Sequence, residues 1–188
     1  MGHDARILPW RVTDSKTLLR DRWIDVRGDA CVTARGVDVA PYYVLGYPDW
    51  VHVLAIDDAD RIVLVTQYRH ALGGPSTELP GGAVDAGDTD IIAAGRRELV
   101  EETGYAAATF ELVARLSPNP ATHANRVHIL LARGAFKAGN AQPEPSEDLV
   151  VDLLPRQGVV DLALSGGMIN AVHVGLLMIG LRALDQAR

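Results

Sequence analysis

The chain of 188 residues contains one cysteine, Cys31, and only two phenylalanines. A single cysteine excludes an internal disulfide framework and a cysteine-rich zinc site, and it fits a reducing compartment. Lysine and arginine number 18 against 24 acidic residues, and the basic residues form no stripe, so a nucleic-acid partner is disfavoured. An anionic ligand would have to be bound locally, by metal ions and a few individual arginines.

Long apolar runs are also missing. The longest, residues 168–184, contains Asn170, His173 and Arg182 and is short for a bilayer span. Residues 1–13 mix charges and lack the apolar core of a signal peptide. We therefore expect a cytoplasmic protein with no membrane association. Repeats, low-complexity tracts and long linkers are absent as well, so one principal domain is expected.

Strand patterns lie on both sides of one predicted helix. Residues 51–56 and 62–68, rich in β-branched side chains, predict a hairpin around a four-residue turn, and Pro41 predicts an edge strand or a bulge. The further strands are expected at 23–26, 31–34, 39–45, 108–116, 127–132 and 149–154, and two final helices at 157–164 and 168–187. This order predicts an α+β fold whose mixed sheet is covered on two faces.

The central helix is expected at residues 89–103. Asp88 or Thr89 can cap its start, and Gly104 is placed for a left-handed cap at its end. Gly95 lies on the side that carries apolar residues and costs about 1 kcal/mol relative to alanine in a helix, which favours close packing of the helix on the sheet.

Three acids of this helix, Glu98, Glu101 and Glu102, fall within roughly one 100° arc of its surface. Their charges repel one another, and the helix dipole disfavours them near the C-terminus. Stability alone does not favour this arrangement, whereas carboxylates are the ligands that Mg²⁺ and Mn²⁺ prefer. An isolated acidic turn is usually a solvated face. Here a Gly-rich bend, residues 78–82, precedes the helix and could direct a backbone carbonyl to the same place, which favours a metal site.

Residues 82–105 resemble the Nudix box: a glycine, a Glu six residues on, seven variable residues, then Arg-Glu-apolar-any-Glu-Glu-any-Gly-apolar. The second half matches at every specified position except the last, where Tyr105 is only partly apolar. Asp88 stands where the family has Glu, and eight residues rather than seven separate it from Arg97. Both departures lie upstream of the acids and leave the positions of the acids on the helix unchanged. In the family the first acid of the box supports the site through the box arginine, here Arg97, and the shorter Asp88 on a longer loop is less suited to reach it.

The resemblance implies specific roles. Glu98, Glu101, Glu102 and the carbonyl of Gly81 would bind Mg²⁺ or Mn²⁺, with Glu101 and Glu102 central to catalysis, and Arg97 would orient the glutamates.

Segments outside the box extend this resemblance toward Nudix enzymes acting on ADP-ribose and nucleotide sugars. The sequence Gln-Tyr-Arg ending at Arg69 implies a contact with substrate phosphate, although a strand-end surface arginine is the alternative. Glu147 is predicted to be an additional catalytic carboxylate, or else an ordinary residue of an acidic loop. Trp50 is a candidate to stack on the base, or a packing residue. His123, in the Pro-rich loop after the box, receives no catalytic role.

As a whole the resemblance implies an α/β/α Nudix sandwich at residues 49–188, and an N-terminal strand region at residues 1–48 that pairs subunits and covers the substrate. The expected activity is metal-dependent hydrolysis of a nucleoside diphosphate sugar such as ADP-ribose, by a homodimer. Hydrolysis of nucleoside triphosphates or dinucleoside polyphosphates is the main alternative. A non-catalytic nucleotide-sugar sensor is disfavoured because such a protein would have lost acids from the helix.

Overall fold

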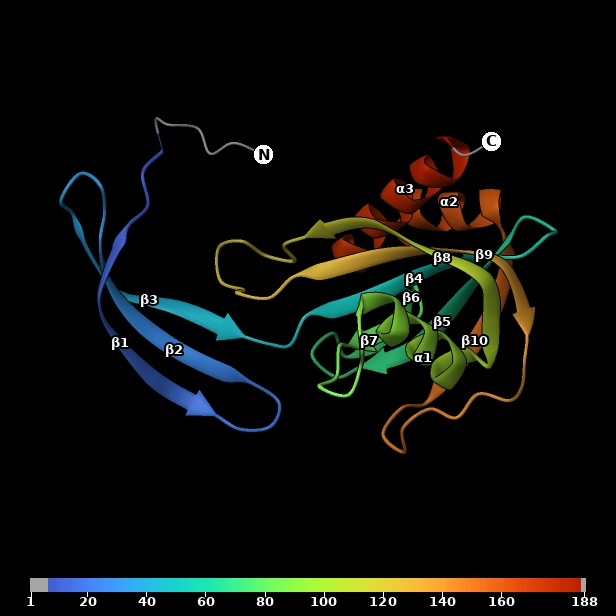
Figure 1. Cartoon of the computed structure of the whole chain (residues 1–188), viewed down its shortest axis with the longest axis horizontal. Coiled ribbons are helices and arrows are strands. Elements are labelled where there is room, and N and C mark those ends of the chain that lie inside the picture. Colours follow the sequence, from blue (N-terminus) through green and yellow to red (C-terminus); the bar gives the residue numbers. More distant parts are fainter. Residues whose placement is uncertain (1–6, 187–188) are drawn as a thin grey trace. The chain divides into compact units, whose positions relative to one another are not determined.

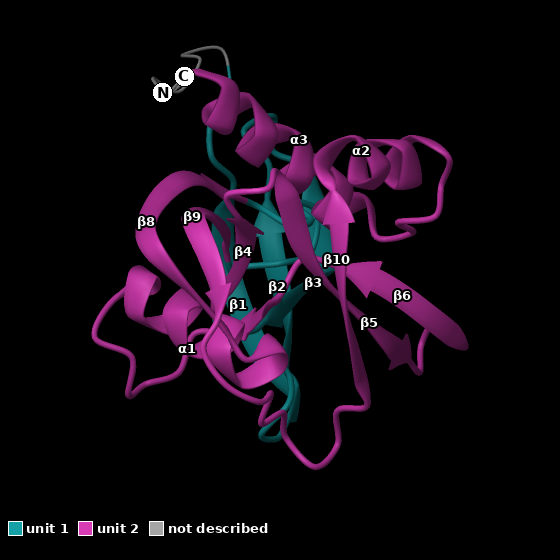
Figure 2. Cartoon of the chain, turned by 90° about the vertical axis from the view of Figure 1, so that its right-hand side faces the viewer, with its two compact units in different colours: residues 1–48, 117–125 teal, residues 49–116, 126–188 magenta. Residues whose placement is uncertain are grey.

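The computed structural model describes residues 7–186, which divide into two compact units (Figure 2). The first unit contains residues up to Pro48 together with Ser117–Asn125. The second contains Asp49–Leu116 and the chain from Arg126 onward. The loop after the box, which the sequence assigned to the second domain, thus clusters with the N-terminal strands.

The first unit is a three-stranded antiparallel sheet of β1 (Arg11–Arg20), β2 (Asp25–Val32) and β3 (Asp38–Gly46), in that order. Pro41 lies on the edge strand β3, opposite a register shift in β2, as predicted. The sequence missed β1, whose ten residues are all exposed, because a strand without a buried face shows no alternation of apolar and polar residues.

The second unit is built on a seven-stranded mixed sheet (Figure 1). The central strands are β10 (Leu149–Pro155), β5 (Arg61–Arg69), β4 (Trp50–Ile56), β9 (Val127–Lys137) and β8 (Tyr105–Leu116), in that order. Only β4 and β9 run parallel; the other pairs are antiparallel. The helices are α1 (Ile91–Thr103), α2 (Arg156–Leu164) and α3 (Ala171–Gln186).

Helices cover both faces of this sheet, which confirms the predicted α/β/α sandwich (Figure 1). Alternate residues of β4 point to opposite sides: Val53 packs in the cluster with α1, and Leu54 packs in the cluster with α2 and α3. Gly95 lets α1 approach closely, because a Cβ there would lie 2.3 Å from Leu130 Cδ1. Gly180 does the same for α3, 2.7 Å from Leu54 Cδ2.

The predicted hairpin exists, but its strands separate soon after the turn. Ile56 and Ile62 form the single residue pair between β4 and β5. Beyond it β4 pairs with β7 (Gly81–Ala83), and β5 pairs with β6 (Gly74–Glu78). Strand β6 ends and β7 begins within the bend predicted at residues 78–82. The sequence predicted neither strand, because their pairing is supplied by β5 and β4 rather than by β-forming residues of their own. The divergence leaves space at one end of the sheet.

The ends of the helices correct some boundaries. Helix α1 begins at Ile91 and is capped by Asp90, whose carboxylate accepts a hydrogen bond from the Ala93 N–H at 2.8 Å, so the predicted caps Asp88 and Thr89 were wrong. Gly104 ends α1 in the left-handed conformation, φ 67°, as predicted. Helix α3 begins at Ala171, three residues later than expected, and residue 187 lies outside the described chain. Between residues 7 and 186 no helix has the length and apolarity to cross a membrane.

Candidate active site

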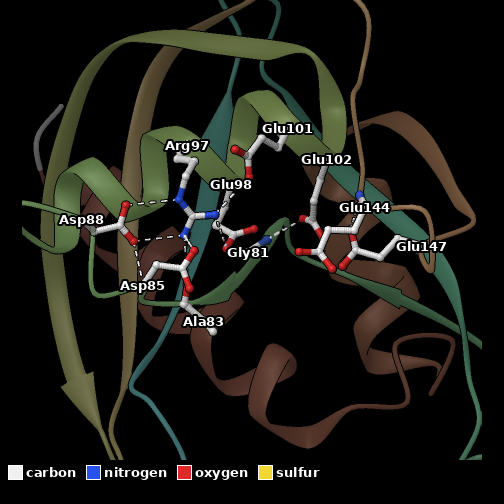
Figure 3. Close-up of polar contacts among 10 residues, drawn as sticks. All are labelled: Gly81, Ala83, Asp85, Asp88, Arg97, Glu98, Glu101, Glu102, Glu144 and Glu147. Carbon is white, nitrogen blue, oxygen red and sulfur yellow. Dashed lines mark hydrogen bonds and ion pairs between the residues drawn. The ribbon is translucent and has the colours of Figure 1, made fainter. Parts of the chain in front are cut away.

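Helix α1 presents its three glutamates in different environments (Figure 3). Glu102 is 3% exposed, and its Oε2 accepts a hydrogen bond from the Gly81 N–H at 2.7 Å. Glu98 packs over Gly82, where a Cβ would lie 2.8 Å from Glu98 Oε1, so a larger residue there would require the Glu98 carboxylate to move. Glu101 is half-exposed. The Gly-rich bend and the acid helix therefore meet, as the sequence indicated.

Arg97 connects these acids to the loop before the helix (Figure 3). Its Nε and Nη2 donate to the two carboxylate oxygens of Asp88, at 3.1 and 3.0 Å, in a bidentate pair. Its Nη1 donates to Glu98 Oε1 and to Glu101 Oε2, each at 3.0 Å, and Nη2 also reaches the Ala83 carbonyl at 3.0 Å. Asp88 therefore reaches Arg97 despite its shorter side chain and longer loop, and the pair raises the pKa of Arg97 while lowering that of Asp88.

Burial makes two of the glutamates weak acids. It raises the pKa of Glu98 to about 7, against the opposing charge of Arg97. It raises the pKa of Glu102 to about 8, and the neighbouring Glu98 and Glu147 add to the effect, although the Gly81 N–H acts in the opposite direction. Without a compensating cation Glu102 therefore stays mostly protonated at neutral pH, and Glu98 is close to half protonated. The site is therefore prepared for positive charge that the side chains around it supply only in part.

A pocket of about 360 Å³ opens where β4 and β5 diverge. Five of the residues selected from sequence line it, namely Trp50, Arg69, Gly81, Glu102 and Glu147. Glu98, Glu101 and Arg97 lie on α1 beside it. His123 belongs to the first unit, where its ring stacks on Tyr47 with centroids 5.4 Å apart.

The pocket lining also contains residues that the sequence did not reveal. Glu78 pairs with Arg69, with 2.6 Å between Oε2 and Nη2 and 3.2 Å between Oε1 and Nε. His52 from β4 and His173 from α3 pack edge to face, with ring centroids 4.3 Å apart. The other lining residues outside the box are Gln67, Asn170 and Val172. No spacing pattern unites positions 52, 78 and 173, because only the sheet topology brings them together.

The donor set fits a hard divalent cation. Carboxylates of Glu98, Glu101 and Glu102 project from one helix, and Glu147 lies close enough to raise the pKa of both Glu98 and Glu102 by charge repulsion (Figure 3). Within residues 7–186 no three such side chains already form a coordination sphere, since Arg97 and the Gly81 N–H engage them. Each of these hydrogen bonds uses one oxygen of its carboxylate, so a bound ion would take the other oxygens, in a cluster whose chemistry suits Mg²⁺ or Mn²⁺.

Comparison with known proteins agrees with this geometry. Residues 46–165 match the Nudix domain, and residues 10–45 match the nucleoside diphosphate sugar hydrolase N-terminal domain. The chain belongs to the Nudix family. The box resemblance that the acid helix suggested is thereby confirmed, and the N-terminal match precedes it in the sequence.

Several relatives of this Nudix chain are known. An ADP-ribose pyrophosphatase of Mycobacterium tuberculosis is 32% identical over 126 residues, 66% of this chain and 60% of that protein. A methanol dehydrogenase activator of Bacillus methanolicus is 34% identical over 111 residues, 59% of each chain. The matched region thus spans about 60% of the length of these relatives. A solved ADP compounds hydrolase shares the fold, with a TM-score of 0.84 over 96% of this chain and 97% of its own, at 21% identity.

Proposed function

We propose that this Nudix protein hydrolyses the pyrophosphate bond of a nucleoside diphosphate sugar, with ADP-ribose as the leading example, to a nucleoside monophosphate and a sugar phosphate. The observation that carries the proposal is the pocket, whose lining brings the acids Glu102 and Glu147 together with the cation Arg69. The N-terminal domain match and the relatives named ADP-ribose pyrophosphatase support the same substrate class.

The acidic residues of helix α1 and the bend before it would hold the metal. Glu98, Glu101, Glu102 and the Gly81 carbonyl are the proposed ligands, and Mg²⁺ or Mn²⁺ bound there supplies charge neutralisation for the phosphate oxygens and an acidified water. Arg97 fixes the carboxylates of Glu98 and Glu101 through its Nη1 group. Its own position is fixed by Asp88, so the orientation of the ligands depends on a residue outside the helix.

The remaining pocket residues would bind and activate the substrate. Glu78 engages Nε and Nη2 of Arg69, whose planar guanidinium still presents Nη1 to a diphosphate. Glu147 is proposed to accept a proton from the attacking water, because its carboxylate lines the pocket near Glu102. Trp50 offers an aromatic wall to the organic part of the substrate.

The charge of the pocket favours a diphosphate linkage over a triphosphate. Among the described residues that line the pocket, Arg69 is the only lysine or arginine. Its guanidinium is already paired with Glu78. A triphosphate carries more charge than this wall can neutralise, whereas Asn170, Val172 and Trp50 provide uncharged surface for a sugar or base.

A substrate panel tests the proposal. Release of nucleoside monophosphate from ADP-ribose, GDP-mannose, dGTP and a dinucleoside polyphosphate is measured with Mg²⁺, with Mn²⁺ and with a chelator. We expect metal-dependent turnover of a diphosphate sugar and its loss in Glu101→Gln and Glu102→Gln. A wide preference for dGTP or the dinucleoside compound would replace the substrate class. Binding of ADP-ribose without turnover under every condition would indicate the sensor function instead.

The first unit is proposed to pair two copies of the chain. Strand β1 exposes Val12, Leu18 and Leu19, each more than half accessible, in a sheet that no helix of this unit covers. Apolar surface of this kind marks interaction sites. Light scattering should give the mass of a homodimer, and Leu18→Glu should shift it toward the monomer, whereas Val150→Glu, an equally exposed site on β10, should not. A monomeric wild-type protein would refute the pairing.

A further inference from the structure

A chain of buried polar groups links helix α3 to Arg69 and to the bend before Gly81. His173 and Glu78 are 3% and 2% exposed, respectively. His173 Nε2 lies 3.4 Å from Glu78 Oε2, and Glu78 in turn holds Arg69. On the other side of its ring, Nδ1 of His173 accepts a hydrogen bond from the Leu79 N–H at 3.0 Å. All four residues belong to the second unit.

These contacts fix the tautomer of His173. A backbone N–H only donates, so Nδ1 must carry no proton where it faces Leu79. A neutral imidazole then carries its proton on Nε2, the atom that faces the Glu78 carboxylate. Burial lowers the pKa of His173 to about 4, which keeps the ring neutral in solutions near pH 7. His52, packed edge to face on this ring, restricts its rotation.

The contact between His173 and Glu78 affects Arg69, the residue proposed to bind the substrate phosphate. Glu78 occupies two of the five N–H groups of Arg69, so the remaining ones lie on the Nη1 side of a guanidinium whose orientation Glu78 sets. The side chain of Arg69 is 45% exposed and would be mobile without this partner. The Nε2 of His173, 3.4 Å from Glu78 Oε2, is beyond normal hydrogen-bond length, so its N–H favours the position of this carboxylate through the attraction between the N–H dipole and the negative charge.

The contact between His173 and Leu79 affects the bend that places Gly81 against Glu102. Leu79 is two residues before Gly81, whose N–H binds Glu102, and the intervening Pro80 carbonyl accepts a hydrogen bond from the Val53 N–H at 2.8 Å. The Leu79 N–H is thus one of the anchors that set the path of the bend. Since φ of Gly81 is 149°, a conformation that other residues rarely adopt, the bend needs such anchors to hold its shape.

We propose that His173 is a positioning residue with two separable tasks: its Nε2–H orients Arg69 through Glu78, and its Nδ1 anchors the bend that places Gly81 against Glu102. The proposal rests on the proposed function for its kinetic readout. This role does not follow from the Nudix box. His173 lies about 70 residues beyond the box, on helix α3, which covers the opposite face of the sheet from α1.

Two conservative variants separate the tasks. In His173→Asn the amide oxygen can replace Nδ1 toward Leu79, but the side chain is too short for Glu78. In His173→Gln the longer amide can reach Glu78, but the Leu79 contact is lost. His173→Leu removes both. Leu181→Ala serves as the control, because Leu181 is a buried α3 residue eight positions away that does not line the pocket.

The expected results differ between variants. His173→Asn should raise KM for ADP-ribose about 10-fold with kcat nearly unchanged, since an interaction with a charged partner is weakened. His173→Gln should instead raise the metal concentration for half-maximal activity about 10-fold and lower kcat. Leu181→Ala should lower the urea midpoint and leave KM, kcat and metal dependence of the folded protein unchanged. The two tasks would be refuted if both conservative variants showed equal kinetic losses and these losses followed only the fall in the urea midpoint, for which Leu181→Ala is the reference.

Two readouts do not need turnover. Long-range proton–nitrogen NMR of the wild-type imidazole should show Nδ1 unprotonated and Nε2 protonated, and the reverse tautomer would overturn the geometry. Titration with the non-hydrolysable methylene analogue of ADP-ribose should show weaker binding in His173→Asn than in His173→Gln. A wild-type protein that binds this analogue but hydrolyses no diphosphate would refute the proposed function alone. Equal affinities of the two variants would refute the role of His173 alone.

Discussion

Replacement of Glu102 by glutamine tests the electrostatics of the site without any substrate. In the metal-free folded chain the carboxyls of Glu98 and Glu102 keep their protons up to about pH 7 and 8, whereas an unfolded chain releases them near 4.5. The folded state therefore binds more protons between these limits, and its free energy of unfolding falls as the pH rises. His52 and His173, whose pKa values are lowered, act in the opposite direction but only below about pH 6.5.

The window from pH 6.5 to 9 therefore isolates the acids. Glu102 crosses about 1.5 pH units between 6.5 and its pKa of about 8, and each unit corresponds to about 1.4 kcal/mol, so its ionisation should cost about 2 kcal/mol. Glutamine cannot ionise, and its amide oxygen can still accept the Gly81 N–H bond. We expect the unfolding free energy of Glu102→Gln to fall about 2 kcal/mol less than that of the wild type across this window.

Urea denaturation with a chelator present, repeated at half-unit pH steps, measures the difference. Glu111→Gln, an exposed site on β8, is the control and should follow the wild-type curve. Mg²⁺ at about 100 times its dissociation constant should then restore about 2.7 kcal/mol to the wild type at pH 9 but much less to Glu102→Gln. Parallel wild-type and Glu102→Gln curves between pH 6.5 and 9 would show that the Glu102 carboxyl is already ionised, and the reasoning from burial would fail.

Three further substitutions test the packing and the pocket. Gly95→Val should lower the unfolding free energy by about 1–3 kcal/mol in urea, because its side chain would overlap Leu130; an unchanged midpoint would contradict the close approach of α1. Arg97→Lys keeps the charge but loses the bidentate contact with Asp88, so the metal concentration for half-maximal activity should rise about 10–100-fold, and an unchanged value would remove Arg97 from the site. Arg69→Lys should raise KM for ADP-ribose about 10-fold with a smaller change in kcat, and an effect confined to kcat would argue against a phosphate contact.

The sequence predicted the second unit well where burial imposes a period. The strands at 51–56 and 62–68 and the helix ending at Gly104 follow from apolar patterns and a capping glycine. Strand β1 could not be found in this way, since no residue of it is buried and its pairing comes from β2. Strands β6 and β7 are likewise paired by β5 and β4 in a region rich in glycine and proline.

The candidate site divides along the same line. Glu98, Glu101, Glu102 and Arg97 are close in sequence, so helical geometry alone brings them together. The contact of Asp88 with Arg97 depends on the path of a loop, which spacing did not define. The association of Glu78, His52 and His173 depends on the whole sheet and on the packing of α3 over it, so it becomes visible only in three dimensions.

The separation of β4 and β5 after a single residue pair has a consequence for how this protein can change its ligand. The opening between them is produced by backbone pairing, because each strand finds a new partner and the sheet remains hydrogen-bonded on both sides. Side chains line this opening but do not produce it. Residues such as Trp50, Gln67 and Val172 can therefore be exchanged to suit a different base or sugar while the cavity and the acid helix beside it persist.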